Sequence, residues 1–476
     1  MFDNCHGLSS SPLRLQMRNT ITEYTCRLLL PQPQVESIAL APYIELLRIE
    51  RMNMSEKLPL AIVGCGGMGH RHLYGLAELQ SAGLSPFELV GACDPNLDNA
   101  HSLADQAEER LGTRPQPVKD LAELASVAPV QAVDITTLPA HHHTVAIEAM
   151  ERGWHALCEK PMGLTARACK QMIAKAQETG CVLSVAENYR RDPVNRLAKS
   201  LLDAGVIGHP RLMQQIAIGG GDGMLISVWR HQKNASGVLL DVGVHFADIM
   251  EYFLGEADTA YAQTRLHEPI RKNPVAGRAD ASSGSPGGVY ERWQKDMPAE
   301  FEATADDAAY ATILFKSGTV AQYIEDHAAH GQNLRQRSIH GSLGSLDLPG
   351  DRSGDRLTLH LDGAAPIDDQ ALLDLVPDHR LDEVTAALFG GDRLFEYHFP
   401  FPETDRKLIA VEYHELGTCI QQGQQPEVDA QQGARSVALS YSLMESQVAG
   451  RALSVDAVCD DQINAYQAEI NEHLGL

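Results

Sequence analysis

The chain has 476 residues, of which 44% are hydrophobic and 21% charged, a composition typical of a folded globular protein with room for two or three domains. Its 63 acidic residues against 39 basic ones give a net charge of −24, which argues against nucleic acid or an anionic membrane as a partner, because both bind basic patches. No apolar run approaches the ~18–20 residues of a membrane span, so we expect no membrane insertion.

Residues 1–56 differ from the rest of the chain, because prolines interrupt them and they lack the apolar core of a signal peptide. Two interpretations stay open. The segment is a poorly ordered extension, or the reading frame begins too early and the true start is Met52 or Met54. We prefer the second.

The first strong motif comes directly after an apolar run at 58–63 and reads Gly64-x-Gly66-x-x-Gly69, with a helical pattern after it. Gly64 would allow a tight turn, Gly66 the approach of a pyrophosphate, and Gly69 close packing of helix on strand. The pyrophosphate would then lie at the helix N-terminus. The predicted cofactor-binding residues of this loop are Gly64, Gly66, Gly67, Met68 and Gly69.

A second apolar run, 87–93, ends at Asp94, which lies 25 residues past Gly69. A carboxylate at this strand end would bind the ribose hydroxyls of a dinucleotide. It would also repel a 2′-phosphate, so we predict NAD as the cofactor, with NADP as the less favoured alternative.

Strand-like and helical stretches alternate up to about residue 185, which predicts a doubly wound parallel sheet, a Rossmann domain, over 57–185. The predicted strands are 58–63, 88–93, 132–136, 155–158 and 182–185. Residues 186–476 predict a second, α+β domain with a large, mostly antiparallel open sheet and an insertion near 268–305. Its predicted strands are 211–218, 310–315, 320–325, 337–341 and 356–361, with helices at 195–204, 237–253 and 406–448.

The sequence Cys158-Glu159-Lys160-Pro161 stands at a predicted strand end, the edge where open α/β sheets bind ligands. Pro161 favours an extended backbone conformation at Lys160, and the peptide bond between the two residues can be cis or trans. By itself the motif fits an active-site lysine or a solvated surface lysine.

In the predicted helix 237–253, Asp241 and His245 stand at i and i+4 and therefore on one face. The other faces are apolar, which predicts a buried helix. A buried histidine beside a carboxylate can act as an acid or base near neutral pH. The alternative is a purely structural His–Asp hydrogen bond.

Taken in order, these motifs closely resemble the Gfo/Idh/MocA oxidoreductases, the group of glucose–fructose oxidoreductase and inositol dehydrogenase. The resemblance spans roughly residues 58–255 and, more loosely, the tail to 455. It is carried by the glycine motif, Asp94, Thr137, His142, Glu159-Lys160-Pro161, Trp229-Arg230 and Asp241-x-Gly243-x-His245.

The resemblance implies an NAD(P)-binding domain and a cleft in which a sugar or cyclitol hydroxyl is oxidised. It implies that Lys160 stabilises charge on the reacting oxygen, that His245 takes or returns its proton, and that Asp241 orients both substrate and His245. It further places Thr137, His142, Glu159 and Lys160 beside the cofactor, and Tyr189, Arg190, Trp229 and Arg230 beside the substrate. A homodimer or homotetramer formed through the open sheet is also implied.

Three adjacent histidines, His141 to His143, suggest a metal site, but consecutive helical residues point in different directions, so we predict no metal. Two departures from the family pattern are Leu138, where proline is common, and Ser236-Gly237 in place of Gly-Gly. The 268–305 segment is longer than the family core requires.

We therefore predict an NAD(P)-dependent dehydrogenase acting on a secondary hydroxyl of a sugar, glycoside or cyclitol. One alternative is a redox-neutral enzyme, glycosidase-like or epimerase-like, that retains its NAD. A second, less favoured, is a non-catalytic NAD-binding regulator. The nine cysteines form no CxxC pair, which argues against zinc and disulfides and favours the cytoplasm.

Overall fold

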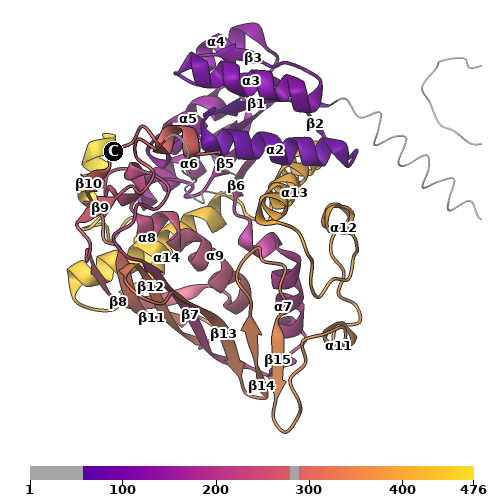
Figure 1. Cartoon of the computed structure of the whole chain (residues 1–476), viewed down its shortest axis with the longest axis vertical. Helices are drawn as coiled ribbons and strands as arrows, with labels where there is room; N and C mark the ends of the chain where they lie inside the picture. Colours follow the sequence, from indigo (N-terminus) through magenta and orange to yellow (C-terminus); the bar gives the residue numbers. More distant parts are fainter. Residues whose placement is uncertain (1–56, 279–288) are drawn as a thin grey trace, which may run out of the picture. The chain divides into compact units, whose positions relative to one another are not determined.

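The computed structural model describes residues 57–278 and 289–476, all within one compact unit, Glu56–Leu476. The two interpretations of residues 1–56 lie outside the described residues. Two sheets and a two-stranded ribbon organise the described chain (Figure 1). Its helices include none that combines the length and apolar content needed to cross a membrane.

The first sheet has six strands, all parallel, in the order β3-β2-β1-β4-β5-β6. Its strands are β1 (Leu58–Val63), β2 (Phe87–Cys93), β3 (Gln116–Val118), β4 (Ala132–Ile135), β5 (His155–Glu159) and β6 (Leu183–Ala186). The order reverses between β1 and β4, and ligands of such sheets bind at the carboxyl ends beside that reversal. The predicted doubly wound parallel sheet is confirmed.

Several helices between these strands begin and end at residues that commonly cap helices. Asn96 accepts a hydrogen bond from the Asp98 N–H at the start of α3, and Gly112 ends that helix in the left-handed conformation. The helices are α2 (Gly67–Ser81), α3 (Leu97–Leu111), α4 (Leu121–Val127), α5 (Pro139–Glu151) and α6 (Ala166–Thr179).

The second sheet has eight strands in the order β15-β14-β13-β7-β12-β11-β8-β16, and only β7 and β12 pair in parallel. The predicted mostly antiparallel sheet is therefore confirmed, although β8, β14 and β16 were not predicted. The strands are β7 (Pro210–Gly220), β8 (Ala257–Arg265), β11 (Ala308–Phe315), β12 (Val320–Ala329), β13 (Leu334–Gly341), β14 (Gly344–Leu348), β15 (Thr358–Leu361) and β16 (Leu453–Ser454).

The C-terminal helices return to the first sheet. The helix α13 (Phe401–Gln422) packs on α2, and a Cβ at Gly75 would come within 2.5 Å of Ile409, so the two helices need a glycine at this crossing. The helix α14 (Ala430–Ala449) packs on α6, α9 and β8. The remaining helical segments are η1 (Tyr189–Arg191), α7 (Pro193–Asp203), η2 (Val228–His231), α11 (Ala371–Asp374), α12 (Glu383–Phe389), α15 (Val455–Cys459) and α16 (Ala468–Leu474).

The predicted single helix over 237–253 is wrong, because the structure has two helices, α8 (Val238–Asp241) and α9 (Gly243–Leu254), with Val242 between them. A Cβ at Gly243 would come within 3.2 Å of Glu325 and 3.4 Å of Tyr323. The chain therefore lies tightly against side chains of β12 at a glycine, a residue of low helix propensity. The break therefore changes which hydrogen-bond partners the Asp241 and His245 side chains have.

The described part of the 268–305 insertion is folded. It contains β9 (Ile270–Lys272), paired antiparallel with β10 (Glu300–Glu302), and the short helix α10 (Glu291–Gln294). Fully buried Arg271 donates to Asp307 at 2.7 Å and to the carbonyl of Gly221 at 2.8 Å, which fixes the ribbon to the second sheet.

Candidate active site

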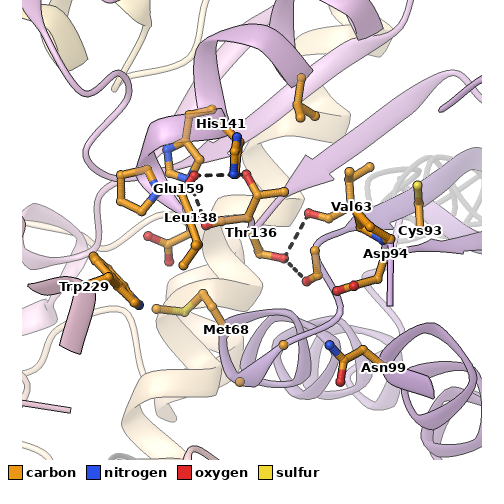
Figure 2. A pocket seen from close by; sticks show the side chains of 18 of the residues that line it. Val63, Met68, Cys93, Asp94, Asn99, Thr136, Leu138, His141, Glu159 and Trp229 are labelled. Atoms are coloured by element: carbon orange, nitrogen blue, oxygen red, sulfur yellow. Dashed lines mark hydrogen bonds between the residues drawn. The ribbon is translucent and has the colours of Figure 1, made fainter. Parts of the chain in front are cut away.

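A cavity of about 670 Å³ opens at the carboxyl ends of β1, β2, β4 and β5. One wall is the Gly-rich loop with Asp94, Thr137 and Lys160, and the facing wall comes from residues 226–241 and from the insertion. Figure 2 shows the Met68 side chain directed towards Trp229 across this cavity. The cavity therefore brings the predicted cofactor loop and several predicted substrate residues together.

The glycines of the loop differ in what surrounds them. A Cβ at Gly64, where φ is +100°, would come within 2.6 Å of the Thr137 nitrogen, and one at Gly69 within 2.3 Å of the Gly64 oxygen. A Cβ at Gly66, by contrast, would meet no described atom within 4 Å. Space for a phosphate therefore lies beside Gly66, next to the N-terminus of α2.

Asp94 lies at the end of β2 and is half-buried. Its carboxylate accepts hydrogen bonds from the backbone N–H groups of Cys65 and Asn96, both at 2.8 Å. These bonds fix the carboxylate beside the Gly-rich loop, and Figure 2 shows it near Asn99. The position fits ribose hydroxyls, which would donate to the remaining lone pairs.

At the end of β4, the Thr136 hydroxyl donates to the Gly64 carbonyl at 2.6 Å (Figure 2). Buried His142 lies between two carbonyls, with Nδ1 2.8 Å from Pro161 O and Nε2 3.1 Å from Thr137 O. Its neighbour His141 is exposed. His142 thus joins the β4 and β5 strand ends where both border the cavity.

Beneath the cavity lies a buried ionic cluster that the sequence did not reveal. The His72 ring, fully buried, contacts Asp134 at 3.0 Å through Nδ1 and Glu159 at 3.1 Å through Nε2. Burial alone lowers the pKa of His72, but the two carboxylates outweigh burial and raise that pKa well above its usual value. The charged ring therefore fixes Glu159, the residue before Lys160.

Lys160 enters the cavity from the end of β5, and its bond to Pro161 is cis. Its Nζ donates to the Asp241 carbonyl at 2.8 Å and to Asp241 Oδ1 at 3.1 Å, while Arg230 Nε donates to Oδ2 at 2.8 Å. Burial alone raises the pKa of Asp241, but the two cations outweigh burial and hold that pKa well below its usual range. Asp241 is therefore an anion between two cations.

His245 does not pair with Asp241, which corrects the predicted orienting role of that carboxylate. Its Nδ1 instead lies 2.7 and 2.8 Å from the two carboxylate oxygens of Glu187, and its ring stacks on Tyr189 with centroids 4.3 Å apart. The break at Val242 explains the difference, because Asp241 and His245 do not share one continuous helix. Neither His245 nor Glu187 is among the described residues that line the cavity.

Two of the predicted substrate residues lie elsewhere than expected. Arg190 is buried, donates to both oxygens of Asp248 at 2.8 and 2.5 Å, and does not line the cavity. Tyr189 supports the His245 ring. Trp229 and Arg230 do line the cavity, with the Arg230 guanidinium 4.1 Å from the Trp229 ring centroid.

Comparison with known proteins identifies the family. Residues 58–187 match the family model described as an oxidoreductase family with an NAD-binding Rossmann fold, Gfo/Idh/MocA, and residues 195–347 match the model of its C-terminal domain. The chain belongs to the Gfo/Idh/MocA family. It is therefore an NAD-binding oxidoreductase, which confirms the predicted family, enzyme class and cofactor.

Curated relatives are 24–29% identical to this chain over the segments that align. Levoglucosan dehydrogenase from Pseudarthrobacter phenanthrenivorans is 29% identical over 61% of this chain and 73% of its own length. The scyllo-inositol 2-dehydrogenase (NAD(+)) of Bacillus subtilis is 28% identical over 46% of this chain and 60% of its own length.

Solved Gfo/Idh/MocA-like structures share the fold. An NAD binding oxidoreductase from Klebsiella pneumoniae superposes with a TM-score of 0.65 at 23% identity, covering 84% of this chain and 99% of that one. Levoglucosan dehydrogenase in complex with NADH gives 0.64 at 22% identity, with the same coverage.

Sequence reasoning missed several residues of this Gfo/Idh/MocA site. Glu187 comes directly after β6, so a carboxylate at a parallel strand end was the available signal. Met297, Trp293 and Tyr290 line the cavity from the insertion, where no periodic pattern marked them. Ile226 also lines it with φ at +59°, a conformation that is unusual for a β-branched residue.

Proposed function

We propose that this chain is an NAD-dependent dehydrogenase that removes a hydride from a secondary hydroxyl of a sugar, glycoside or cyclitol. The observation that carries the proposal is the cluster of Lys160, Asp241 and Arg230, which borders the same cavity as the Gly-rich loop and Asp94. Curated relatives named for levoglucosan and scyllo-inositol support this substrate class.

The cofactor fits the cavity wall formed by the first sheet. Gly66, Gly67 and Met68 would hold the pyrophosphate, Asp94 the ribose, and Thr137 with His142 the nicotinamide side. When bound, NAD supplies the hydride acceptor. The anionic Asp94 at the ribose position favours NAD over NADP.

Lys160 would stabilise negative charge on the substrate oxygen. Its ammonium is fixed by the Asp241 carbonyl and carboxylate, and a third donor hydrogen remains for a ligand in the cavity. A prepositioned cation at the oxygen that develops charge lowers the barrier more than it helps substrate binding. Asp241 balances the charges of Lys160 and Arg230.

His245 lies outside the described cavity lining but near enough to Lys160 and Asp241 for their charges to act on its pKa. It would accept the hydroxyl proton of a substrate held by Lys160, with Glu187 rather than Asp241 as its partner. When the Glu187 carboxylate accepts the Nδ1–H, the neutral ring presents Nε2 as an unprotonated acceptor. Burial lowers the pKa of His245 well below its usual value, and the charges of Lys160 and Arg352 lower it further, so the ring is neutral before the reaction. Glu187 is thus a positioning residue.

A second candidate function is a redox-neutral reaction in which the NAD stays bound. The observation that favours it is the packing of Tyr290 directly over the Gly-rich loop. A regulator without catalysis is disfavoured, because the lysine, the aspartate and the buried Glu187–His245 pair have no use in nucleotide sensing alone.

We propose in addition that the chain works in the cytoplasm as a homo-oligomer. The described cysteines are free thiols, which suits a reducing compartment. Exposed Tyr261, Tyr310 and Leu314 on the second sheet suit an interface between copies.

The test of the main proposal is NADH formation, measured by its absorbance, by the purified chain with NAD and a panel of sugars, glycosides and inositols. We expect one substrate class to react, and Lys160→Ala to abolish turnover while NAD binding by calorimetry persists. Lys170→Ala, an exposed lysine on α6, is the matched control. Turnover of Lys160→Ala within about twofold of wild type would contradict the proposal.

A further inference from the structure

The insertion contributes aromatic side chains to the dinucleotide site. Residues 289–297, the segment around α10, place Tyr290, Trp293 and Met297 on the cavity. The segment comes from the chain's second half, yet it reaches the Gly-rich loop of the first. The cofactor-binding loop is therefore bordered by residues that lie more than two hundred positions away in the sequence.

Tyr290 packs directly against Gly67. A Cβ at Gly67 would come within 2.5 Å of two carbons of the Tyr290 ring, so only a glycine admits the ring at this point. Arg71 Nη1 donates to the Tyr290 hydroxyl at 3.5 Å, and that hydroxyl lies 3.9 Å from Met68 Sδ. The ring therefore covers Gly67 in the first turn of α2, beside the open position at Gly66 that a pyrophosphate would take.

Trp293 contacts the same loop from a second direction. Its ring meets the His70 ring edge to face, with centroids 6.5 Å apart, and His70 Nδ1 lies 2.9 Å from the Gly66 carbonyl. Gly66 nevertheless keeps the open space beside it. The two aromatic rings thus flank the loop and leave the phosphate position itself free.

The segment is anchored on its other side. Buried Gln294 donates through Nε2 to the Ile226 carbonyl at 2.8 Å, and Asn273 donates to the Gln294 carbonyl at 2.8 Å. Ile226 adopts φ +59°, a strained conformation for a β-branched residue that persists only where surrounding contacts enforce it. The rings are therefore carried on a braced segment rather than on a free loop.

We propose that Tyr290 and Trp293 are cofactor-binding residues that close the dinucleotide site over the Gly-rich loop and slow dinucleotide release. A dinucleotide whose pyrophosphate lies in the open space beside Gly66 is bordered by the Tyr290 ring at Gly67 and by the Trp293 ring at His70, so the two rings narrow its way out of the site. The proposal deepens the second candidate function, because a retained NAD suits redox-neutral turnover. It rests on NAD binding alone and not on the identity of the substrate.

The test is the rate of NADH release from the full chain. Protein loaded with NADH is mixed with excess NAD in a stopped-flow instrument, and the loss of NADH fluorescence gives the dissociation rate. We expect Tyr290→Ala combined with Trp293→Leu to release NADH at least about tenfold faster than wild type, and to retain less dinucleotide on purification. Val448→Ala, which removes exposed apolar surface on α14 away from the cavity, is the control.

Unchanged release from the double variant, with wild-type circular dichroism, would overturn the proposal. If the double variant does not fold, Tyr290→Leu and Tyr290→Phe decide. Tyr290→Leu removes the aromatic ring and should speed NADH release, whereas Tyr290→Phe keeps the ring and should not. Equal NADH release rates in these two variants would contradict the proposal. A chain that releases NADH slowly but oxidises no polyol would refute the dehydrogenase proposal. It would leave the proposal for Tyr290 and Trp293 in place.

Discussion

At the scale of single residues, two carboxylates of this site have opposite environments. Asp241 lies between Lys160 and Arg230, which hold its pKa well below the usual range against the effect of burial. Glu187 is buried against a neutral imidazole, and burial raises its pKa to about 7. Such a divergence separates a fixed anion from a group that titrates near neutral pH.

The Glu187 titration predicts the pH dependence of the reaction. A proton on Glu187 would make its hydroxyl the donor to His245 Nδ1, so Nε2 would carry the ring hydrogen and could not accept another. Activity therefore requires the ionised carboxylate, and we expect kcat/KM for oxidation to rise with pH through about 7. This apparent value belongs to the coupled pair.

The charged groups that act on this pair are Lys160, Arg190, Arg352, Asp241 and Glu159. Glu187→Gln removes the titrating carboxylate, so we expect the acid limb near pH 7 to disappear and the plateau of kcat/KM to fall about 10²- to 10⁴-fold. The measurement is the pH profile between about pH 5 and pH 9. Exposed Glu256→Gln is the control, and an unaltered acid limb in Glu187→Gln would be incompatible with the assigned role.

At the scale of elements, α2 connects the dinucleotide loop to the rest of the fold. Its N-terminus borders the cavity, Arg71 donates to both oxygens of Asp405 on α13 at 2.8 and 2.5 Å, and His72 reaches β4 and β5. Glu78, further along, accepts from Arg406 and Lys407 of α13. One helix therefore fixes the loop, Glu159 and the C-terminal helix together.

The buried His72 predicts a large loss of stability on substitution. His72→Ala leaves the Asp134 and Glu159 carboxylates buried without their cation, for a loss of about 3–5 kcal/mol in the free energy of unfolding. Exposed His101→Ala on α3 is the control. Urea unfolding of both variants is the measurement, and equal midpoints for the two would show that the cluster contributes nothing.

The His72 cluster also determines how the folding stability that His72 contributes changes with pH. The folded-state pKa of His72 is raised above its unfolded value of about 6.5. Its stabilisation is therefore complete below about pH 6.5 and is lost as the pH rises through the folded-state pKa. We expect the difference between wild type and His72→Ala to shrink as the solution is made alkaline.

Sequence patterns predicted those elements that residues close together in the sequence determine. The parallel strands β1, β2, β4, β5 and β6 are short, mostly apolar and buried runs, and the glycine motif places the loop. The break at Val242 was not predicted, because the apolar pattern continues across it and the close approach of Gly243 to Glu325 and Tyr323 joins residues far apart in the sequence. The bond between Glu187 and His245 joins residues 58 apart in the chain, a distance over which no periodicity carries information.

At the scale of the whole described chain, the second sheet has two different faces. The helix α14, packed on β8, and the helix α9, whose Phe246 ring contacts the Tyr323 ring of β12, cover one of them. On the other face, Tyr261 of β8 pairs with Thr312 of β11 and is therefore diagonal to Tyr310 and Leu314. These three side chains are 45%, 38% and 39% exposed, an apolar patch that a lone copy leaves in water.

This patch predicts self-association. Burying it between two copies removes aromatic and aliphatic surface from water, which stabilises an assembly with a mass of two or four times 51.9 kDa. Placing lysines at Tyr261 and Leu314 puts charges into that interface, so Tyr261→Lys combined with Leu314→Lys should sediment as a monomer. The control is Val127→Lys, a 49% exposed residue on α4 of the first sheet. Sedimentation velocity is the measurement. A monomeric wild type would contradict self-association, and a double variant that keeps the mass of the wild-type assembly would show that the interface does not include this patch.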